Sequence, residues 1–204
     1  MEKDNLDFLR QHKPTLIGLP EAKKAAVCIP LIGTENGWDL LFEVRAADID
    51  SQPGDVCFPG GSVEAGETTK EAAVREIMEE LLIEKDQVEV LGLMDLFGGG
   101  SGMLYVYPYA VRLTGYEGTF STDEVDRVFR APLSWFLEHD PEVYCTRLTV
   151  QPGEDFPYEK IHGGREYAWR ERRDEVLFYQ YKEETIWGMT AKILHAFVEI
   201  YKNK

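Results

Sequence analysis

Basic residues are scarce in this sequence of 204 residues, which has 22 lysines and arginines against 37 aspartates and glutamates and a formal net charge of −15. A chain this acidic is repelled by the phosphate backbone of nucleic acids and by anionic membrane surfaces, so we expect neither as a partner. A small phosphorylated substrate would bind only where a metal ion or a basic patch offsets this negative charge locally.

Cysteine and long hydrophobic runs are also lacking. Cys28, Cys57 and Cys145 are odd in number, widely spaced and without a Cys-x-x-Cys pair, which indicates plain thiols and neither a disulfide framework nor a zinc site. No apolar stretch approaches the ~18 residues of a membrane-spanning helix, and the opening Met-Glu-Lys-Asp-Asn lacks the basic and apolar regions of a signal peptide. We therefore expect a cytoplasmic protein.

The length suits a single domain, residues 1–204, able to remove roughly 70% of its unfolded surface from water. Apolar runs at residues 25–32 and 38–45 flank a turn at Asn36-Gly37 and predict paired strands. Further strands are predicted at residues 88–97, 103–113 and 176–181, and a closing helix from about Glu184. The pattern indicates a mixed α/β (α+β) fold, as a monomer or a homodimer.

A glycine-rich segment that leads into a short helix carries the strongest chemical signal. Thr68 and Glu71 form a capping-box pattern that predicts a helix start near Thr69. At helical spacing, one face collects apolar side chains and the other collects acidic ones; the apolar positions are Val74, Ile77, Met78 and Leu81, and the acidic ones are Glu76, Glu79 and Glu80.

Carboxylates three and four residues apart on a helix repel each other, by a few tenths of a kcal/mol or more where water is excluded. Such a cluster favours a hard, oxygen-preferring cation, and Mg2+ or Mn2+ is the natural choice because both accompany substrate phosphates. A glutamate-rich face is also common as a plain solvated surface, and that alternative stays open on spacing alone.

Residues 61–83 resemble the Nudix box, Gly-x5-Glu-x7-Arg-Glu-apolar-x-Glu-Glu-x-Gly-apolar. The matching positions are Gly61, Glu67, Arg75, Glu76, Ile77, Glu79, Glu80 and Ile83. Leu82 stands where the pattern has a glycine, which normally closes the helix. The resemblance implies a Nudix fold, with a mixed β-sheet between helices, and a hydrolase that cleaves a phosphorus-containing acid anhydride.

The resemblance also implies roles for the box residues. Glu67, Glu76, Glu79 and Glu80 would hold Mg2+ or Mn2+, with a backbone carbonyl of Gly60 or Gly61 as a further ligand. Arg75 would pair with a box carboxylate, and Glu67 is the expected partner. Glu79 or Glu80 is favoured as the base that deprotonates the attacking water, with Glu124, from a segment resembling the family's Asp-Glu-Val...Pro-Leu motif, as the third candidate.

A second resemblance, over residues 41–61, is to the motif that precedes the box in Nudix coenzyme A pyrophosphatases. It includes Arg45 as a phosphate contact, with a salt bridge at the strand end as the alternative. Phe42 and Glu43 replace Leu-Thr, and Asp50 replaces a second arginine. The implied substrate is coenzyme A or acyl-coenzyme A; the alternatives are ADP-ribose or a nucleotide sugar, and a non-catalytic nucleotide-binding module.

Residues 142–182 match the family least and predict added β-hairpins. Within them, residues 160–173 are locally basic, and Arg165 and Arg170 are candidate clamps for an extra phosphate because guanidinium groups match phosphate oxygens. Interleaved acidic residues favour the alternative of a salt-bridged hairpin.

Overall fold

The computed structural model describes residues 23–49, 51–99 and 104–203. Its larger sheet follows the order β3-β2-β1-β7-β5, with β4 beside β1, β6 beside β7 and β8 beside β2. The strands are β1 (Lys23–Thr34), β2 (Gly37–Arg45), β3 (Val56–Cys57), β4 (Gly60–Ser62), β5 (Val88–Leu93), β6 (Phe97–Gly99), β7 (Leu104–Leu113) and β8 (Val125–Pro132). β1 and β7 are parallel, whereas β1–β2 and the other pairs are antiparallel, so the sheet is mixed as predicted.

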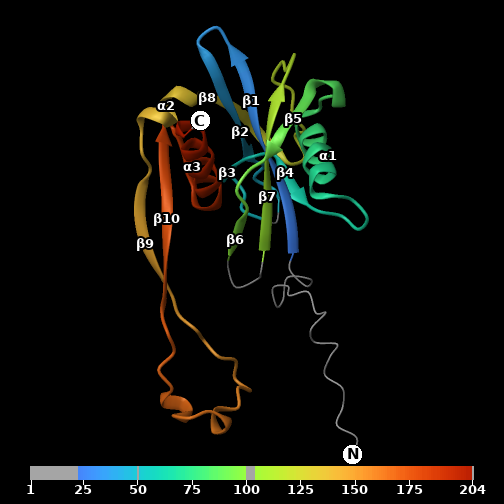
Figure 1. Cartoon of the computed structure of the whole chain (residues 1–204). Coiled ribbons are helices and arrows are strands. Elements are labelled where there is room, and N and C mark those ends of the chain that lie inside the picture. The colour runs from blue at the N-terminus through green and yellow to red at the C-terminus, as the bar shows by residue number, and fades with distance from the viewer. Residues whose placement is uncertain (1–22, 50, 100–103, 204) are drawn as a thin grey trace, which may run out of the picture.

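Helices cover both faces of this sheet (Figure 1). α1 (Thr69–Leu81) lies on one face, and α2 (Leu133–Glu138) and α3 (Gly188–Lys202) lie on the other. Alternate residues of β2 supply the two cores: Phe42 packs in the cluster that includes α3, and Leu41 packs in the cluster that includes α1. None of the helices described is long and apolar enough to cross a lipid bilayer.

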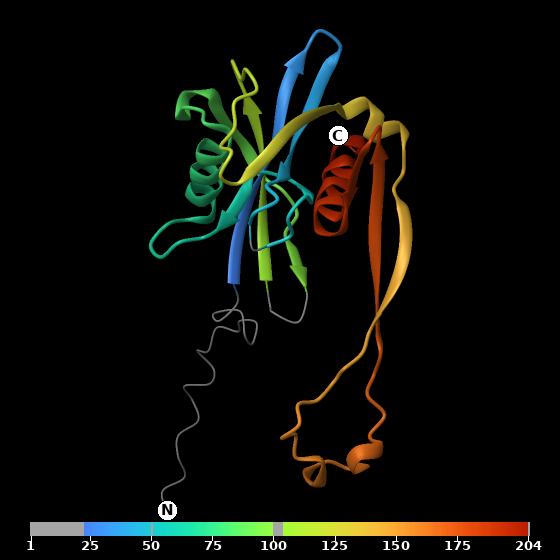
Figure 2. The same cartoon turned by 180° about the vertical axis from the view of Figure 1, so that it is seen from behind.

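A second sheet consists of β9 (Glu142–Leu148), β10 (Arg172–Tyr181) and β11 (Glu184–Trp187) in the order β11-β10-β9. β9 and β10 form a long antiparallel hairpin whose connecting segment projects away from the larger sheet (Figure 2). That segment contains two short 3-10 turns, η3 (Tyr158–Lys160) and η4 (Gly164–Glu166). The added hairpin region predicted for residues 142–182 is therefore present, but as one extended hairpin and not as several.

Several local predictions are confirmed, and two are corrected. β1 and β2 pair as predicted, around a turn at Glu35 and Asn36, and Gly37 is the first residue of β2. The closing helix begins at Gly188 and not near Glu184, because Lys182 adopts a left-handed conformation that turns residues 184–187 back to pair with β10. The strand predicted for residues 88–97 is divided into β5 and β6, which pair with different parts of β7.

Candidate active site

The glycines that open the box are required by close contacts with β1 and α1. Gly60 and Gly61 in β4 pair with Val27 and Ala26 of β1. A Cβ atom at Gly60 would lie 2.3 Å from the carbonyl oxygen of Ala26, and one at Gly61 would lie 2.3 Å from Oε1 of Glu76. Only glycine lets the strand and the helix approach this closely, so these residues set the position of the carboxylates.

The predicted capping box fixes the start of α1. The Thr68 hydroxyl accepts a hydrogen bond from the Glu71 N–H at 3.2 Å, and the Glu71 carboxylate accepts one from the Thr68 N–H at 2.8 Å. The helix ends at Leu82, which takes the left-handed conformation (φ 52°, ψ 50°) normally given to glycine, while its N–H donates to the Met78 carbonyl. The helix thus ends where the motif requires, although the glycine is missing.

The predicted division of α1 into apolar and acidic faces is wrong for Glu80, whereas Met78 packs against the core as predicted. The buried side of the helix consists of Ala72, Ala73, Ile77, Glu80 and Leu81. Val74 and Met78 are only partly buried, whereas Glu80 is 3% exposed and faces the sheet. The small side chains Ala72 and Ala73 allow the helix to lie close to β1, which shifts the buried face toward Glu80.

Glu80 is anchored to the glycine turn, since its Oε2 accepts the Gly60 N–H at 2.8 Å. Burial, the largest cause, and the negative charges of Glu43 and Glu76 raise the pKa of Glu80 to about 10. Burial likewise raises the pKa of Glu76 above its ordinary value. A nearby positive charge would therefore favour the ionised form of both carboxyl groups.

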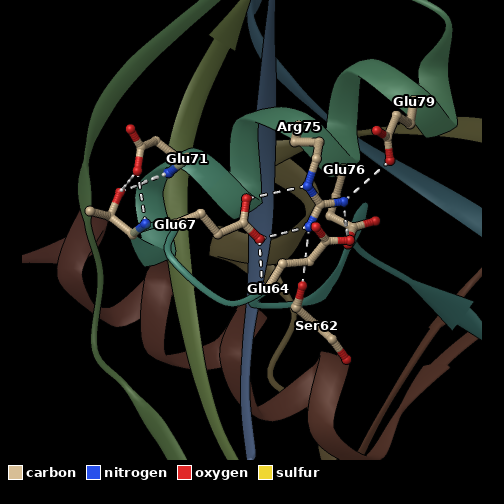
Figure 3. Close-up of polar contacts among 8 residues, drawn as sticks. Ser62, Glu64, Glu67, Glu71, Arg75, Glu76 and Glu79 are labelled. Carbon is tan, nitrogen blue, oxygen red and sulfur yellow. Dashed lines mark hydrogen bonds and ion pairs between the residues drawn. The ribbon is translucent and has the colours of Figure 1, made fainter.

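Arg75 connects the remaining carboxylates, as Figure 3 shows. Its guanidinium group contacts Glu67 at 2.9 and 3.3 Å, Glu76 at 2.9 Å and Glu79 at 3.2 Å, and it donates to the Ser62 carbonyl at 3.2 Å. The expected pair of Arg75 with Glu67 is present. Hydrogen bonds from Arg75 and from the Glu64 N–H hold the pKa of Glu67 below its ordinary value.

The loop that carries Glu124 is held against the end of α1. The Ser121 N–H donates to the Glu80 carbonyl at 2.7 Å, and the Thr119 hydroxyl donates to the Leu81 carbonyl at 2.6 Å. Glu124 itself is exposed, and its backbone carbonyl accepts the Ala46 N–H at 2.9 Å. Its charge contributes to raising the pKa of Glu76 and Glu80, so the structure brings Glu124 to the edge of the box.

A groove of about 250 Å³ adjoins Gly60 and Gly61 and is lined by Arg45 and by mostly apolar side chains from β1, β7 and α3. Trp187 forms part of its wall, stacked on Phe178 and donating to Asp55 at 3.3 Å. We did not predict Trp187 as a site residue, and periodicity gave no signal for it. Arg45 donates to the Ser51 carbonyl at 3.0 Å, and Asp50 lies outside the described residues.

Arg165 and Arg170 are not brought to the box. Both belong to the connecting segment of the β9–β10 arm, which lies away from α1 in both views (Figures 1 and 2). The Arg165 guanidinium lies over the Tyr158 ring at 4.7 Å, and Arg170 is exposed. Their role as a phosphate clamp stays a prediction.

Sequence comparison agrees with the box geometry: the NUDIX domain matches residues 22–155. The chain belongs to the Nudix family. It is 32% identical over 136 residues to the peroxisomal coenzyme A diphosphatase NUDT7 of Mus musculus, a match that spans 66% of this chain and 57% of that protein. It is 30% identical over 191 residues to an uncharacterized Nudix hydrolase, NudL, of Pectobacterium atrosepticum, covering 92% of this chain and 88% of the relative.

Among solved structures, a MutT/nudix family protein from Enterococcus faecalis aligns with a TM-score of 0.53 at 15% identity. The alignment covers 97% of this chain and 68% of that protein. At this identity the likeness concerns the fold alone, and it agrees with the mixed sheet between helices described above.

Proposed function

We propose that this chain is a divalent-metal-dependent hydrolase of the diphosphate linkage in coenzyme A or acyl-coenzyme A, releasing 3',5'-ADP and a 4'-phosphopantetheine. The observation that carries the proposal is that the acidic side chains of the box lie together next to the turn at Gly60 and Gly61. There, Glu80 accepts a hydrogen bond from the Gly60 N–H, and Arg75 contacts Glu67, Glu76 and Glu79. Gly60 and Gly61 also line the groove.

The residues fit a hard cation such as Mg2+ or Mn2+. Carboxylate oxygens are its preferred ligands, and the buried Oε2 of Glu43 next to the box has no hydrogen-bond partner. Within the residues described, no group of three or more acidic, histidine or cysteine side chains is arranged so that it could hold a metal ion. Three of the box carboxylates contact Arg75 instead.

Glu80, Glu76 and Glu67 are the groups we assign to holding the ion. When bound, the cation supplies charge neutralisation for the diphosphate and lowers the pKa of a water molecule. Arg75 keeps the carboxylates in place, and Gly60 or Gly61 would offer a backbone carbonyl as a further ligand.

Glu79 is the residue we assign as the general base. It is the most exposed of the box carboxylates that Arg75 contacts, with 61% of its side chain accessible to water, and Arg75 contacts it at 3.2 Å. Glu80 is buried and anchored, which suits a ligand better than a base. General base catalysis is typically worth about 100- to 10,000-fold in rate.

The preference for coenzyme A is supported by the motif around Arg45, by the activity for which the mouse relative is named and by the apolar lining of the groove, which suits a pantetheine arm. We further propose a cytoplasmic location and a monomer or homodimer in solution.

Turnover of a substrate panel tests the proposal. The panel contains coenzyme A, dephospho-coenzyme A, ADP-ribose and NADH, each with Mg2+, with Mn2+ and with a chelator. We expect metal-dependent cleavage of coenzyme A above the others, and a loss of most of kcat in Glu79→Gln and in Glu80→Gln with the fold intact. Glu89→Gln, in an exposed surface pair with Arg112, is the matched control and should retain full activity.

The outcomes separate the candidate functions. If ADP-ribose is cleaved faster than coenzyme A, the proposed metal-dependent hydrolysis stands and the proposed substrate is wrong. If no compound is cleaved, the result favours a non-catalytic nucleotide-binding module. If Arg165 and Arg170 clamp the 3'-phosphate, their glutamine variants raise the KM for coenzyme A and leave that for dephospho-coenzyme A unchanged.

A further inference from the structure

Glu43 is a buried carboxylate that belongs to none of the box positions. It lies in β2 within an otherwise apolar run and is 1% exposed. Side chains alternate along a strand, and Leu41, two residues earlier, packs in the cluster that includes α1. Glu43 therefore points into the layer between the sheet and α1, the layer that Glu80 enters from the helix.

The two oxygens of Glu43 differ in their surroundings. Oε1 accepts a hydrogen bond from the Cys57 thiol at 3.2 Å, whereas Oε2 is buried and has no partner. Burial, and next the charge of Glu43, raises the pKa of the Cys57 thiol well above its ordinary value, so that this group is a neutral donor. Cys57 fixes one oxygen of Glu43 and leaves the other available for a ligand.

The charge of the Glu43–Glu80 pair is not compensated by a basic side chain. No ion pair joins either carboxylate to an arginine, lysine or histidine among the residues described, since Arg75 is engaged by Glu67, Glu76 and Glu79. Arg45 lies near enough to lower the pKa of Glu43, but burial dominates and raises it to about 7. Burying two charged carboxylates without a counter-ion costs free energy, because both lose their hydration. A bound cation or protonation offsets this cost.

We infer that Glu43 is an additional acidic ligand of the divalent-cation site, and that it holds the ion from the sheet side through Oε2 while Glu80 holds it from α1. The inference rests on the proposed function, because the ion is the one that the box carboxylates serve. It extends the site by a residue that stands where the coenzyme A pyrophosphatase motif has threonine. Glu43 thus adds a negative charge that the motif does not provide.

Binding of Mn2+ to the metal-free full chain, followed by the electron paramagnetic resonance signal of free Mn2+, tests the inference without substrate. We expect Glu43→Gln to raise the Kd for Mn2+ by about 10- to 100-fold, the range seen when groups that support a metal site are removed. Glu43→Asp keeps the charge on a shorter side chain, so its Kd for Mn2+ should lie between those of the wild type and Glu43→Gln. Glu89→Gln is the control and should bind Mn2+ as the wild type does.

Thermal unfolding with and without Mn2+ shows whether a substitution destabilises the fold or weakens only the binding of Mn2+. We expect metal-free Glu43→Gln to be at least as stable as the wild type, because one buried carboxylate is removed, and its stabilisation by Mn2+ to be smaller. A Kd within twofold of the wild type, or an unchanged stabilisation by Mn2+, would overturn the inference.

This result is independent of the proposed activity. If the wild type cleaves no member of the panel but its Mn2+ affinity depends on Glu43, the inference stands and the function fails. If Glu79→Gln abolishes turnover while Glu43→Gln binds Mn2+ normally, the function stands and the inference fails.

Discussion

Arg75 donates to both carboxylate oxygens of Glu67, from Nη2 to Oε1 at 2.9 Å and from Nε to Oε2 at 3.3 Å. This two-point contact joins the loop before α1 to the helix itself, eight residues further along the chain. A lysine at position 75 could neutralise the charge of Glu67, but it could not reproduce the planar fork. Arg75 therefore positions the carboxylates as well as neutralising them.

We expect Arg75→Lys to lower kcat/KM by about 10- to 100-fold, because the box carboxylates lose their fixed orientation. Stability should change little, since partly exposed ion pairs are worth about 0–1 kcal/mol. Steady-state kinetics with Mg2+ and urea unfolding measure the two effects. Arg112→Lys, which alters the surface pair with Glu89, is the control. An equal loss of kcat/KM in both variants would rule out a specific role for Arg75.

Gly61→Ala tests the contact between β4 and α1. The new Cβ would lie 2.3 Å from Oε1 of Glu76, so the carboxylate must swing aside. We expect kcat to fall by about 100-fold, as for an ångström-scale displacement of a catalytic group, with only a small change in Tm. Gly33→Ala is the matched control, because its Cβ would meet Trp38 at an ordinary 3.5 Å. Full activity of Gly61→Ala would mean that Glu76 does not need its observed position.

Leu82→Gly should stabilise the protein. A left-handed conformation costs a non-glycine residue roughly 1–2 kcal/mol, and glycine loses roughly 0.5–1 kcal/mol of unfolded-state entropy, so the expected net gain is about 0.5–1 kcal/mol. Little burial is lost, since Leu82 is 60% exposed. Urea unfolding measures the change. Lys182→Gly, at the left-handed residue between β10 and β11, should give a similar gain, and a destabilised Leu82→Gly would show that the side chain contributes more than its conformation costs.

The capping box makes stability depend on pH through Glu71. Hydrogen bonds from the Thr68 N–H and hydroxyl lower the pKa of Glu71 in the folded protein below the ordinary 4.5. The folded state therefore favours the carboxylate, and this stabilisation is present above the ordinary pKa and is lost as the pH falls through the lowered one.

We expect Glu71→Gln to be less stable than the wild type at pH 7, with the difference closing as the pH falls below about 4. Urea unfolding at pH 7, 5 and 3 measures this. Glu183→Gln, an exposed glutamate in the β10–β11 turn, should show no such pH-dependent difference. A difference for Glu71→Gln that stays constant with pH would contradict the linkage.

Local patterns were enough to predict the elements that depend on neighbouring residues. The Thr68–Glu71 capping box, the Asn36-Gly37 turn and the box spacing all act within a few residues, so the sequence alone placed the start of α1 and the β1–β2 hairpin. The pair of Arg75 with Glu67, which the resemblance to the box implied, is present at 2.9 Å.

The tertiary structure decided which side chains are buried and which segments meet. Helical periodicity cannot tell how closely α1 approaches the sheet, and that approach, permitted by Ala72, Ala73, Gly60 and Gly61, is what buries Glu80. It also brings Glu80 toward Glu43, which lies 37 residues earlier in the sequence. In the sequence, the position of Glu43 within an apolar run was the one sign that its charge is buried. The path of the β9–β10 arm, which carries Arg165 and Arg170 away from the box, depends on long-range strand pairing that local sequence does not encode.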